Sequence, residues 1–223
     1  MAGSEQTVAV IDYGSSNLRS VSKAVEHVAE GRQRVIVTND ASEIANADRV
    51  IFPGQGAIGD CMKNLIEQGL DEVIKTAMAS KPFFGICLGL QSLMDWSDED
   101  GGMNGLGIVP GKVVHFPEDP KDPQTGERLK IPHMGWNQVN PTHDHFMWQG
   151  IESGSRFYFV HSYYVEPDQQ NVIAATTDYC LEFTAAIARD NVFAVQFHPE
   201  KSQHDGLKLL ANFLEWDGVS QNS

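Results

Sequence analysis

The sequence predicts an α/β fold in which a mostly parallel central sheet has helices on both faces and gains antiparallel strands in its second half. Short runs rich in β-branched and aromatic residues alternate with amphipathic segments over the first 91 residues. This alternation is typical of parallel sheets, whose crossover helices cover both faces. After residue 106 the apolar runs follow one another closely, which indicates antiparallel strands.

The chain begins with a predicted strand and helix. TVAVIDYG, residues 7–14, is typical of a buried strand that ends in a turn. A helix is predicted over residues 15–30, with Ser15 or Ser16 as its N-cap. Its apolar stripe consists of Leu18, Val21, Val25 and Val28.

Three more strands and a helical region complete the first half. QRVIVTND (33–40), DRVIFPGQG (48–56) and KPFFGIC (81–87) are the predicted strands. The segment from Gly59 to Ser80 has a helical pattern that is interrupted at Gly69.

The second half is predicted to be rich in strands. They are GIVPGKVVHF (107–116), RFYFVHSYYV (156–165), NVIAATTD (171–178), EFTAAIARD (182–190) and VFAVQFHP (192–199). These strands either extend the main sheet or form a small second sheet. The segment from Pro117 to Lys130 is predicted to be an exposed loop, and DGLKLLANFLEW (205–216) an amphipathic helix that closes the chain.

Length and charge limit the class of protein. The 223 residues are expected to form one domain, residues 1–223. The formal charge of −14, without a basic cluster, argues against nucleic acid or an anionic membrane as partner. Three widely spaced cysteines and no signal-peptide pattern favour a reducing, cytoplasmic setting, and they give no metal-ligand spacing.

Cys87 lies in GICLG, where a strand meets a predicted turn. Glycines on both sides of a nucleophile are typical of the sharp strand-to-helix elbow that exposes a catalytic side chain. A single cysteine is also commonly a buried, inert core residue. The motif by itself leaves both interpretations open.

A thiol nucleophile requires a base, and the base requires a group that orients it. FHPEKS places His198 and Glu200 at the end of an apolar strand. Residues two apart in an extended chain point to the same side, so the imidazole and the carboxylate are expected to meet. The alternative is that both are ordinary loop residues.

PGQGAIG, from Pro53 to Gly59 within FPGQGAIGD, is a glycine-rich loop at another strand end. Its backbone N–H groups are candidates to stabilise the oxyanion of a tetrahedral intermediate, together with the N–H of Leu88. An ordinary turn is the alternative. A dinucleotide-binding loop is disfavoured because a third glycine in register is lacking.

PGQGA, GICLGLQ and FHPEKS, in this order and over this length, resemble the class I (triad) glutamine amidotransferases. Four further segments, IDYGSSNLRSV, GLGIVPGKV, IPHMGWNQV and FYFVHSYYV, are similar to the glutaminase subunits of imidazole glycerol phosphate synthases. The resemblance runs from Val8 to Leu214. It implies a flavodoxin-like amidotransferase fold.

The resemblance also implies roles for individual residues. Cys87 is then the nucleophile, His198 the general base and acid, and Glu200 the residue that orients His198. The implied oxyanion hole consists of Gly54, Gln55, Gly56 and Leu88, where a peptide reorientation is expected for full activity. The implied glutamine-binding residues are Gln91, Glu99, Ser162 and Tyr163, although Tyr163 is equally well interpreted as a core aromatic.

The implied reaction needs no cofactor and no metal. Glutamine is hydrolysed through a γ-glutamyl thioester, and the ammonia passes to a (β/α)-barrel cyclase subunit in a heterodimer, which forms imidazole glycerol phosphate and AICAR. The alternatives are a glutaminase for another synthase, a stand-alone γ-glutamyl cysteine hydrolase, and a non-catalytic binding module.

The resemblance also makes PHMGWN, which we interpret as a polar loop with a methionine and a tryptophan, a candidate contact with the partner. Exposed apolar side chains of this kind are costly unless a partner covers them. The candidate interface residues are Asn17, Met134, Trp136 and Lys201. The alternative is a loop folded onto its own core.

Overall fold

The computed structural model describes residues 5–219. Its helices are α1 (Leu18–Ala29), α2 (Ala41–Asn46), α3 (Ile58–Glu67), α4 (Leu70–Met78), α5 (Leu88–Gln91) and α6 (Gln203–Glu215). The strands of the first half are β1 (Gln6–Ile11), β2 (Gln33–Thr38), β3 (Arg49–Gly54), β4 (Phe83–Cys87), β5 (Met94–Ser97) and β6 (Met103–Asn104). Those of the second half are β7 (Val109–His115), β8 (His133–Gln138), β9 (Asn140–Pro141), β10 (Arg156–His161), β11 (Tyr163–Pro167), β12 (Ile173–Asp178), β13 (Glu182–Arg189) and β14 (Val192–Val195).

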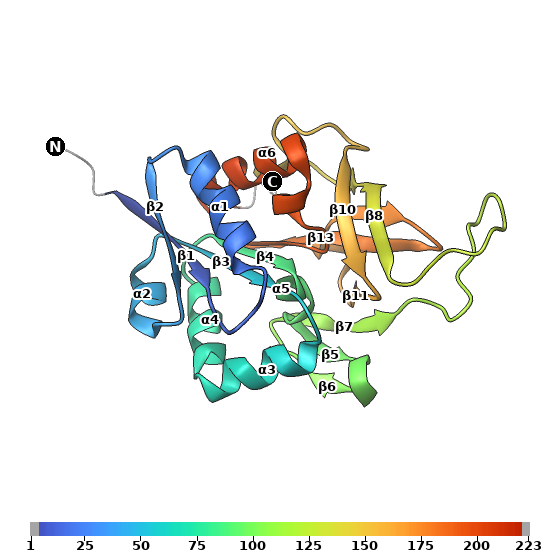
Figure 1. The fold of residues 1–223 in the computed structure, drawn as a ribbon, viewed down its shortest axis with the longest axis horizontal. Helices are drawn as coiled ribbons and strands as arrows, with labels where there is room; N and C mark the ends of the chain where they lie inside the picture. Colours follow the sequence, from blue (N-terminus) through green and yellow to red (C-terminus); the bar gives the residue numbers. More distant parts are fainter. Residues whose placement is uncertain (1–4, 220–223) are drawn as a thin grey trace.

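The centre of the main sheet is parallel, as the sequence predicts. Strands β2, β1, β3, β4 and β14 lie side by side in that order, and each neighbouring pair is parallel. Alternate residues of β1 serve two cores, because Val8 and Val10 face α1 and α6 whereas Ala9 and Ile11 face α2, α3 and α4. The two groups of helices lie on opposite sides of the sheet (Figure 1).

Both predicted arrangements of the second half are present. β13, β11 and β7 continue the main sheet, each antiparallel to the strand before it in the sheet order. At the far edge β5 is parallel to β7, and β6 is antiparallel to β5. β8 and β10 form a separate antiparallel pair, which stands beside the end of α6 in Figure 1. Phe157 and Phe159 of β10 pack into the core that contains α1 and α6.

The segment RFYFVHSYYV, predicted as one strand, is two strands in different sheets. β10 ends at His161 and β11 begins at Tyr163. The His161 ring lies over this break, with Nδ1 2.8 Å from the carbonyl oxygen of Tyr163. Because a carbonyl only accepts, Nδ1 is the protonated nitrogen, and its hydrogen bond closes the bend at Ser162.

Other local predictions were wrong. Asn17, and neither Ser15 nor Ser16, is the N-cap of α1; it makes no side-chain capping bond, and its amide nitrogen donates to Glu200. PHMGWN lies mostly in strand β8, with its residues alternating between core and solvent. The sequence interpretation also missed α2.

The loop from Pro117 to Lys130 is largely irregular, as predicted, with an isolated bridge between Lys121 and Arg128. Within the described residues, no helix has both the length and the apolar character needed to cross a membrane.

Candidate active site

Cys87 lies at the elbow between β4 and α5. Its backbone has φ 55° and ψ −105°, in a region that side chains with a Cβ rarely adopt. The turn is tight because α5 packs directly under β3: a Cβ on Gly89 would lie 1.9 Å from the carbonyl oxygen of Phe52. The glycines around Cys87 therefore permit the close packing that forces the thiol out of the strand.

The glycine-rich loop begins beside this elbow. Gly54, the last residue of β3, pairs with Cys87 in the parallel register. A Cβ on Gly54 would lie 2.5 Å from the Tyr13 hydroxyl and 2.7 Å from Cβ of Leu88, so this glycine is a packing residue. The next two residues, Gln55 and Gly56, reach the pocket wall together with Leu88.

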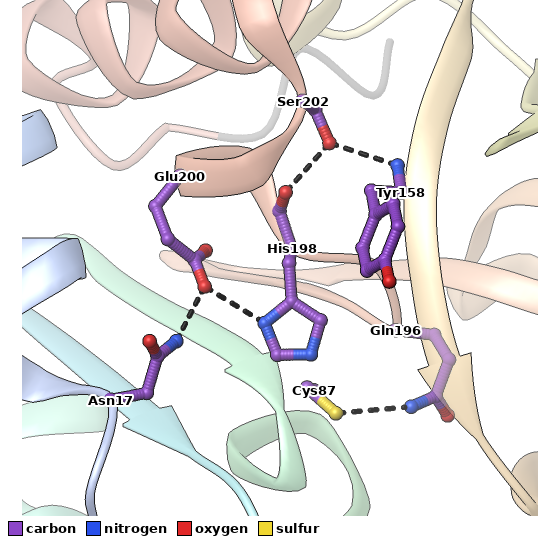
Figure 2. A network of polar contacts seen from close by, with 7 residues as sticks. All are labelled: Asn17, Cys87, Tyr158, Gln196, His198, Glu200 and Ser202. Carbon is purple, nitrogen blue, oxygen red and sulfur yellow. Dashed lines mark hydrogen bonds and ion pairs between the residues drawn. The ribbon is translucent and has the colours of Figure 1, made fainter. Parts of the chain in front are cut away.

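His198 and Glu200 meet as predicted, although Pro199–Lys201 is a 3-10 helix and not the extended segment on which the prediction rested. His198 follows β14, and its Nδ1 lies 2.9 Å from Oε1 of Glu200, with both side chains fully buried. A carboxylate only accepts, so Nδ1 carries the proton. His198 Nε2 has no hydrogen-bond partner among the described residues, and Figure 2 shows the imidazole between Glu200 and Cys87.

Neighbouring polar groups fix the ends of this pair. The Asn17 amide donates to the same Glu200 oxygen at 2.5 Å. The Ser202 hydroxyl donates to the His198 carbonyl at 2.6 Å and accepts the Tyr158 N–H at 3.0 Å (Figure 2). The His198–Glu200 pair is thus linked to the start of α1 through Asn17 and to β10 through Ser202.

The charges of the site favour a His198 imidazolium beside a Glu200 carboxylate. Burial lowers the pKa of His198, but the neighbouring Cys87 and Glu200 outweigh it and raise the pKa to about 10. Burial raises the pKa of Glu200, but the hydrogen bonds from His198 and Asn17 outweigh it and leave the pKa below its ordinary value. An imidazolium beside a negative partner is the expected state at neutral pH.

Cys87 and His198 open onto a pocket of about 390 Å³. Its wall includes all four predicted glutamine-binding residues, which are Gln91, Glu99, Ser162 and Tyr163. The Glu99 carboxylate accepts the Ile58 N–H at 2.9 Å, and burial raises its pKa above the ordinary value. Tyr163 also packs against the core, so both of its interpretations hold.

Two residues of this site were missed from the sequence. Gln196 is fully buried, donates from Nε2 towards the Cys87 sulfur at 3.7 Å and accepts from Gln91 at 3.1 Å. His161 lines the pocket and bonds through Nε2 to His133 at 3.0 Å. The only sequence signal was a polar residue inside each apolar strand.

The candidate interface residues lie in different surroundings. Asn17 is buried beside Glu200, whereas Met134 and Trp136 are exposed on one face of β8, at 62% and 37%. The centroids of the Trp136 and Tyr158 rings are 6.2 Å apart. Lys201, at the pocket wall, has its Nζ 5.9 Å from the centroid of the Tyr158 ring. We call Met134, Trp136, Tyr158 and Lys201 the β8 surface.

No group of three or more His, Cys, Asp or Glu side chains within residues 5–219 is arranged to hold a metal ion. The three cysteines in this part of the chain are free thiols.

Comparison with known proteins shows the family of this chain. The sequence model of the family "Glutamine amidotransferase class-I" matches residues 9–216. A protein of Aromatoleum aromaticum named imidazole glycerol phosphate synthase subunit HisH is 58% identical over 209 residues, which cover 94% of this chain and 98% of the relative. A protein of the same name from Dechloromonas aromatica is 56% identical over 211 residues, covering 95% and 97%.

Two solved structures are similar in fold. One, titled as a glutamine amidotransferase, has a TM-score of 0.69 at 16% identity and covers 93% of this chain and 97% of its own. A glutamine amidotransferase from Thermotoga maritima has a TM-score of 0.67 at 13% identity, covering 96% and 98%.

Proposed function

Because this chain belongs to the class I glutamine amidotransferase family, we propose that it is the glutaminase subunit of an imidazole glycerol phosphate synthase. One structural observation carries the catalytic part: Cys87 at a strained elbow faces His198, which Glu200 holds by its other nitrogen. The choice of synthase rests on the relatives that share more than half of their residues with this chain. The proposal treats residues 1–223 as one glutaminase domain that works in the cytoplasm.

The first half of the proposed reaction forms a thioester. The Cys87 thiolate adds to the side-chain amide carbon of glutamine, and the His198 imidazolium gives its proton to the departing nitrogen as the C–N bond breaks. Ammonia leaves and a γ-glutamyl thioester remains. The raised pKa of His198 supports this step, because it favours the imidazolium that gives this proton.

The second half regenerates the pair. Neutral His198 takes a proton from water, the hydroxide adds to the thioester carbon, and collapse expels the Cys87 thiolate and releases glutamate. In both halves the oxyanion is proposed to bind the Leu88 N–H, which has no partner within its helix, and an N–H of Gln55 or Gly56. Gly56, at φ 97°, is a residue at which this loop can reorient, because glycine adopts such angles without strain.

Glutamine is proposed to lie with its α-ammonium group near Gln91 and Glu99. Both Gln91 N–H bonds are already used, one to the Tyr163 carbonyl at 2.9 Å and one to Gln196. Its oxygen is therefore the atom available to the substrate, and an oxygen matches an ammonium donor. The Glu99 carboxylate adds a second acceptor of the same kind.

The released ammonia is proposed to pass to a cyclase subunit of (β/α)-barrel fold, which joins this chain in a heterodimer and forms imidazole glycerol phosphate and AICAR. The relatives carry the word subunit in their names, which supports a partner. The β8 surface is the proposed docking site because its exposed apolar side chains adjoin the pocket wall through Tyr158 and Lys201.

The test is glutamine hydrolysis by this chain with and without the cyclase and its formimino nucleotide. We expect strong stimulation by the complete mixture, labelling of Cys87 by the electrophile diazo-oxo-norleucine, and loss of glutamine-dependent synthesis in Cys87→Ala. Ammonia-dependent synthesis should survive in that variant. Stimulation by a different synthase instead would reassign the partner, and partner-independent hydrolysis of γ-glutamyl peptides would indicate a stand-alone hydrolase.

A further inference from the structure

We infer that Gln196 is a second catalytic hydrogen-bond donor to the Cys87 sulfur, acting in addition to His198. Its Nε2 lies 3.7 Å from Sγ, within the range of an N–H to sulfur hydrogen bond (Figure 2). The inference rests on the proposed role of Cys87 as nucleophile.

The strand register places Gln196 beside the sulfur. β14 and β4 are parallel neighbours, and Val195 pairs with Ile86. Gln196 directly follows Val195, the last residue of β14, and Cys87 directly follows Ile86 in β4. β14 ends at Val195 and residues 196–197 form a bend, after which the Gln196 and His198 side chains both lie beside the thiol (Figure 2).

The orientation of the Gln196 amide follows from its neighbours. The Tyr163 carbonyl only accepts, so the atom of Gln91 that bonds to it is the amide nitrogen. The same nitrogen bonds to Gln196, which must present its oxygen there. The Gln196 nitrogen is then left facing Cys87, where it is a donor and never an acceptor.

Burial makes this contact specific. Gln196 is fully buried, and its two neighbours in the chain, Val195 and Phe197, are core residues. A buried amide is costly unless its donor and acceptor are both used. Here the oxygen is used by Gln91 and the nitrogen by the sulfur, so the site is built around a polar residue at a position where an apolar one would pack.

The donor matches two steps of the reaction. The sulfur is negatively charged before the thiolate attacks. The negative charge returns to the sulfur when the tetrahedral intermediate formed from the thioester collapses. A fixed N–H beside the sulfur favours the thiolate in both states, and hydrogen bonds to charged groups are the strong ones. The other ionisable side chains around this pocket and elbow are His198, Glu200, Tyr13, Glu99, His161, Tyr163 and Lys201.

The experiment measures alkylation of Cys87 by iodoacetamide in the full chain as a function of pH, with the modified site identified by peptide mass spectrometry. Gln196→Met keeps the volume and removes the donor. We expect alkylation at pH 7 to slow about 10-fold and the half-maximal rate to move up by about one pH unit. Gln196→Glu, which keeps an acceptor for Gln91 but opposes the thiolate, should shift the profile further upward.

The matched control is Asn212→Leu. Asn212, in α6, is also a buried amide. Its side chain donates to the carbonyls of Met147 and Gln149, away from the pocket. Its replacement should lower thermal stability and leave the alkylation profile at the wild-type position. A folded Gln196→Met protein with the wild-type profile overturns the inference.

The wild-type protein provides a test that does not depend on folding of a variant. In a sample with ¹⁵N-labelled glutamine side chains, alkylation of Cys87 should shift the Gln196 amide protons, and unchanged resonances would contradict the inference. If wild-type Cys87 resists alkylation at every pH, the proposed function fails instead. The identity of the synthase has no influence on either readout.

Discussion

Asn17 and Glu200 are 183 positions apart in the chain, and the Asn17 side-chain amide donates to Glu200 Oε1 at 2.5 Å. The same oxygen accepts from His198. The start of α1 therefore holds the carboxylate that holds the imidazole. A residue that we expected at the partner interface lies one contact away from the proposed catalytic base.

Asn17→Ala should reduce glutamine-dependent turnover about 10-fold, because a hydrogen bond to a charged group contributes about 1.5–3 kcal/mol. Asn17→Asp should reduce it further, since a second carboxylate repels Glu200. Steady-state kinetics of the complex measure both effects. The control is Asn39→Ala, which removes an exposed hydrogen bond to Gln68; equal losses in the two alanine variants would disprove a specific role for Asn17.

Gly89→Ala should unfold the elbow, because its Cβ would lie 1.9 Å from a backbone oxygen that cannot move freely. We expect a loss of at least about 1–3 kcal/mol in the free energy of unfolding. The matched control is Gly59→Ala in α3, where the nearest atom is the flexible end of Met103 at 3.1 Å. That change should be neutral or stabilising by about 0.5–1 kcal/mol, as expected for a helix. Urea denaturation compares them, and equal stability would refute the close-packing argument.

Cys87→Ala should lower the pKa of His198 from about 10, because it removes a negative neighbour and leaves burial, which disfavours the imidazolium, less opposed. A ¹³C-labelled histidine NMR titration measures this. In the wild type, the raised pKa means that His198 stabilises the fold fully below its unfolded pKa of about 6.5 and loses that contribution as pH rises towards 10. An unshifted His198 in the alanine variant would show that Cys87 does not influence its charge.

Acid should destabilise the protein through buried neutral histidines. Burial lowers the pKa of His145 to about 4, and His133 is lowered to a similar value for the same reason. Between the unfolded pKa of about 6.5 and this value the unfolded chain binds more protons than the folded protein. The free energy of unfolding therefore decreases as the pH is lowered, by up to about 1.4 kcal/mol per pH unit for each such histidine.

His145→Phe tests that slope, since His145 lies against Phe193 and Trp216, away from the pocket. Between pH 7 and 5 the free energy of unfolding of this variant should depend less steeply on pH than that of the wild type, by about the slope that one bound proton produces. A slope equal to that of the wild type would mean that His145 is protonated in the folded protein.

Met134→Asp should weaken binding to the cyclase at least 10-fold, because it places a charge in the apolar β8 surface. Ile66→Asp is the control: Ile66 is exposed to the same 62%, and it lies on α3. Isothermal titration calorimetry gives the affinities, and matching thermal stabilities show that both variants are folded. If Ile66→Asp weakens binding equally, the docking site lies elsewhere.

Much of the fold was predictable because its signals are local. The alternation of strands and helices, the break at Gly69 and the antiparallel second half follow from periodicity and turn residues. Cys87 between glycines and His198 two positions before Glu200 are equally local patterns. His198 and Glu200 do pair, but across the 3-10 helix Pro199–Lys201 and not along the extended chain that the sequence analysis assumed.

Tertiary structure alone decided the rest. Hydrogen bonds can override continuous strand propensity, as at Ser162, where the His161 ring bonds to the Tyr163 carbonyl and sends two halves of one apolar run into different sheets. Long-range neighbours are set by strand order, which no local period encodes. That is why the Gln196 donor to Cys87, 109 positions away, and the Asn17 donor to Glu200 were visible only once the sheet had been assembled.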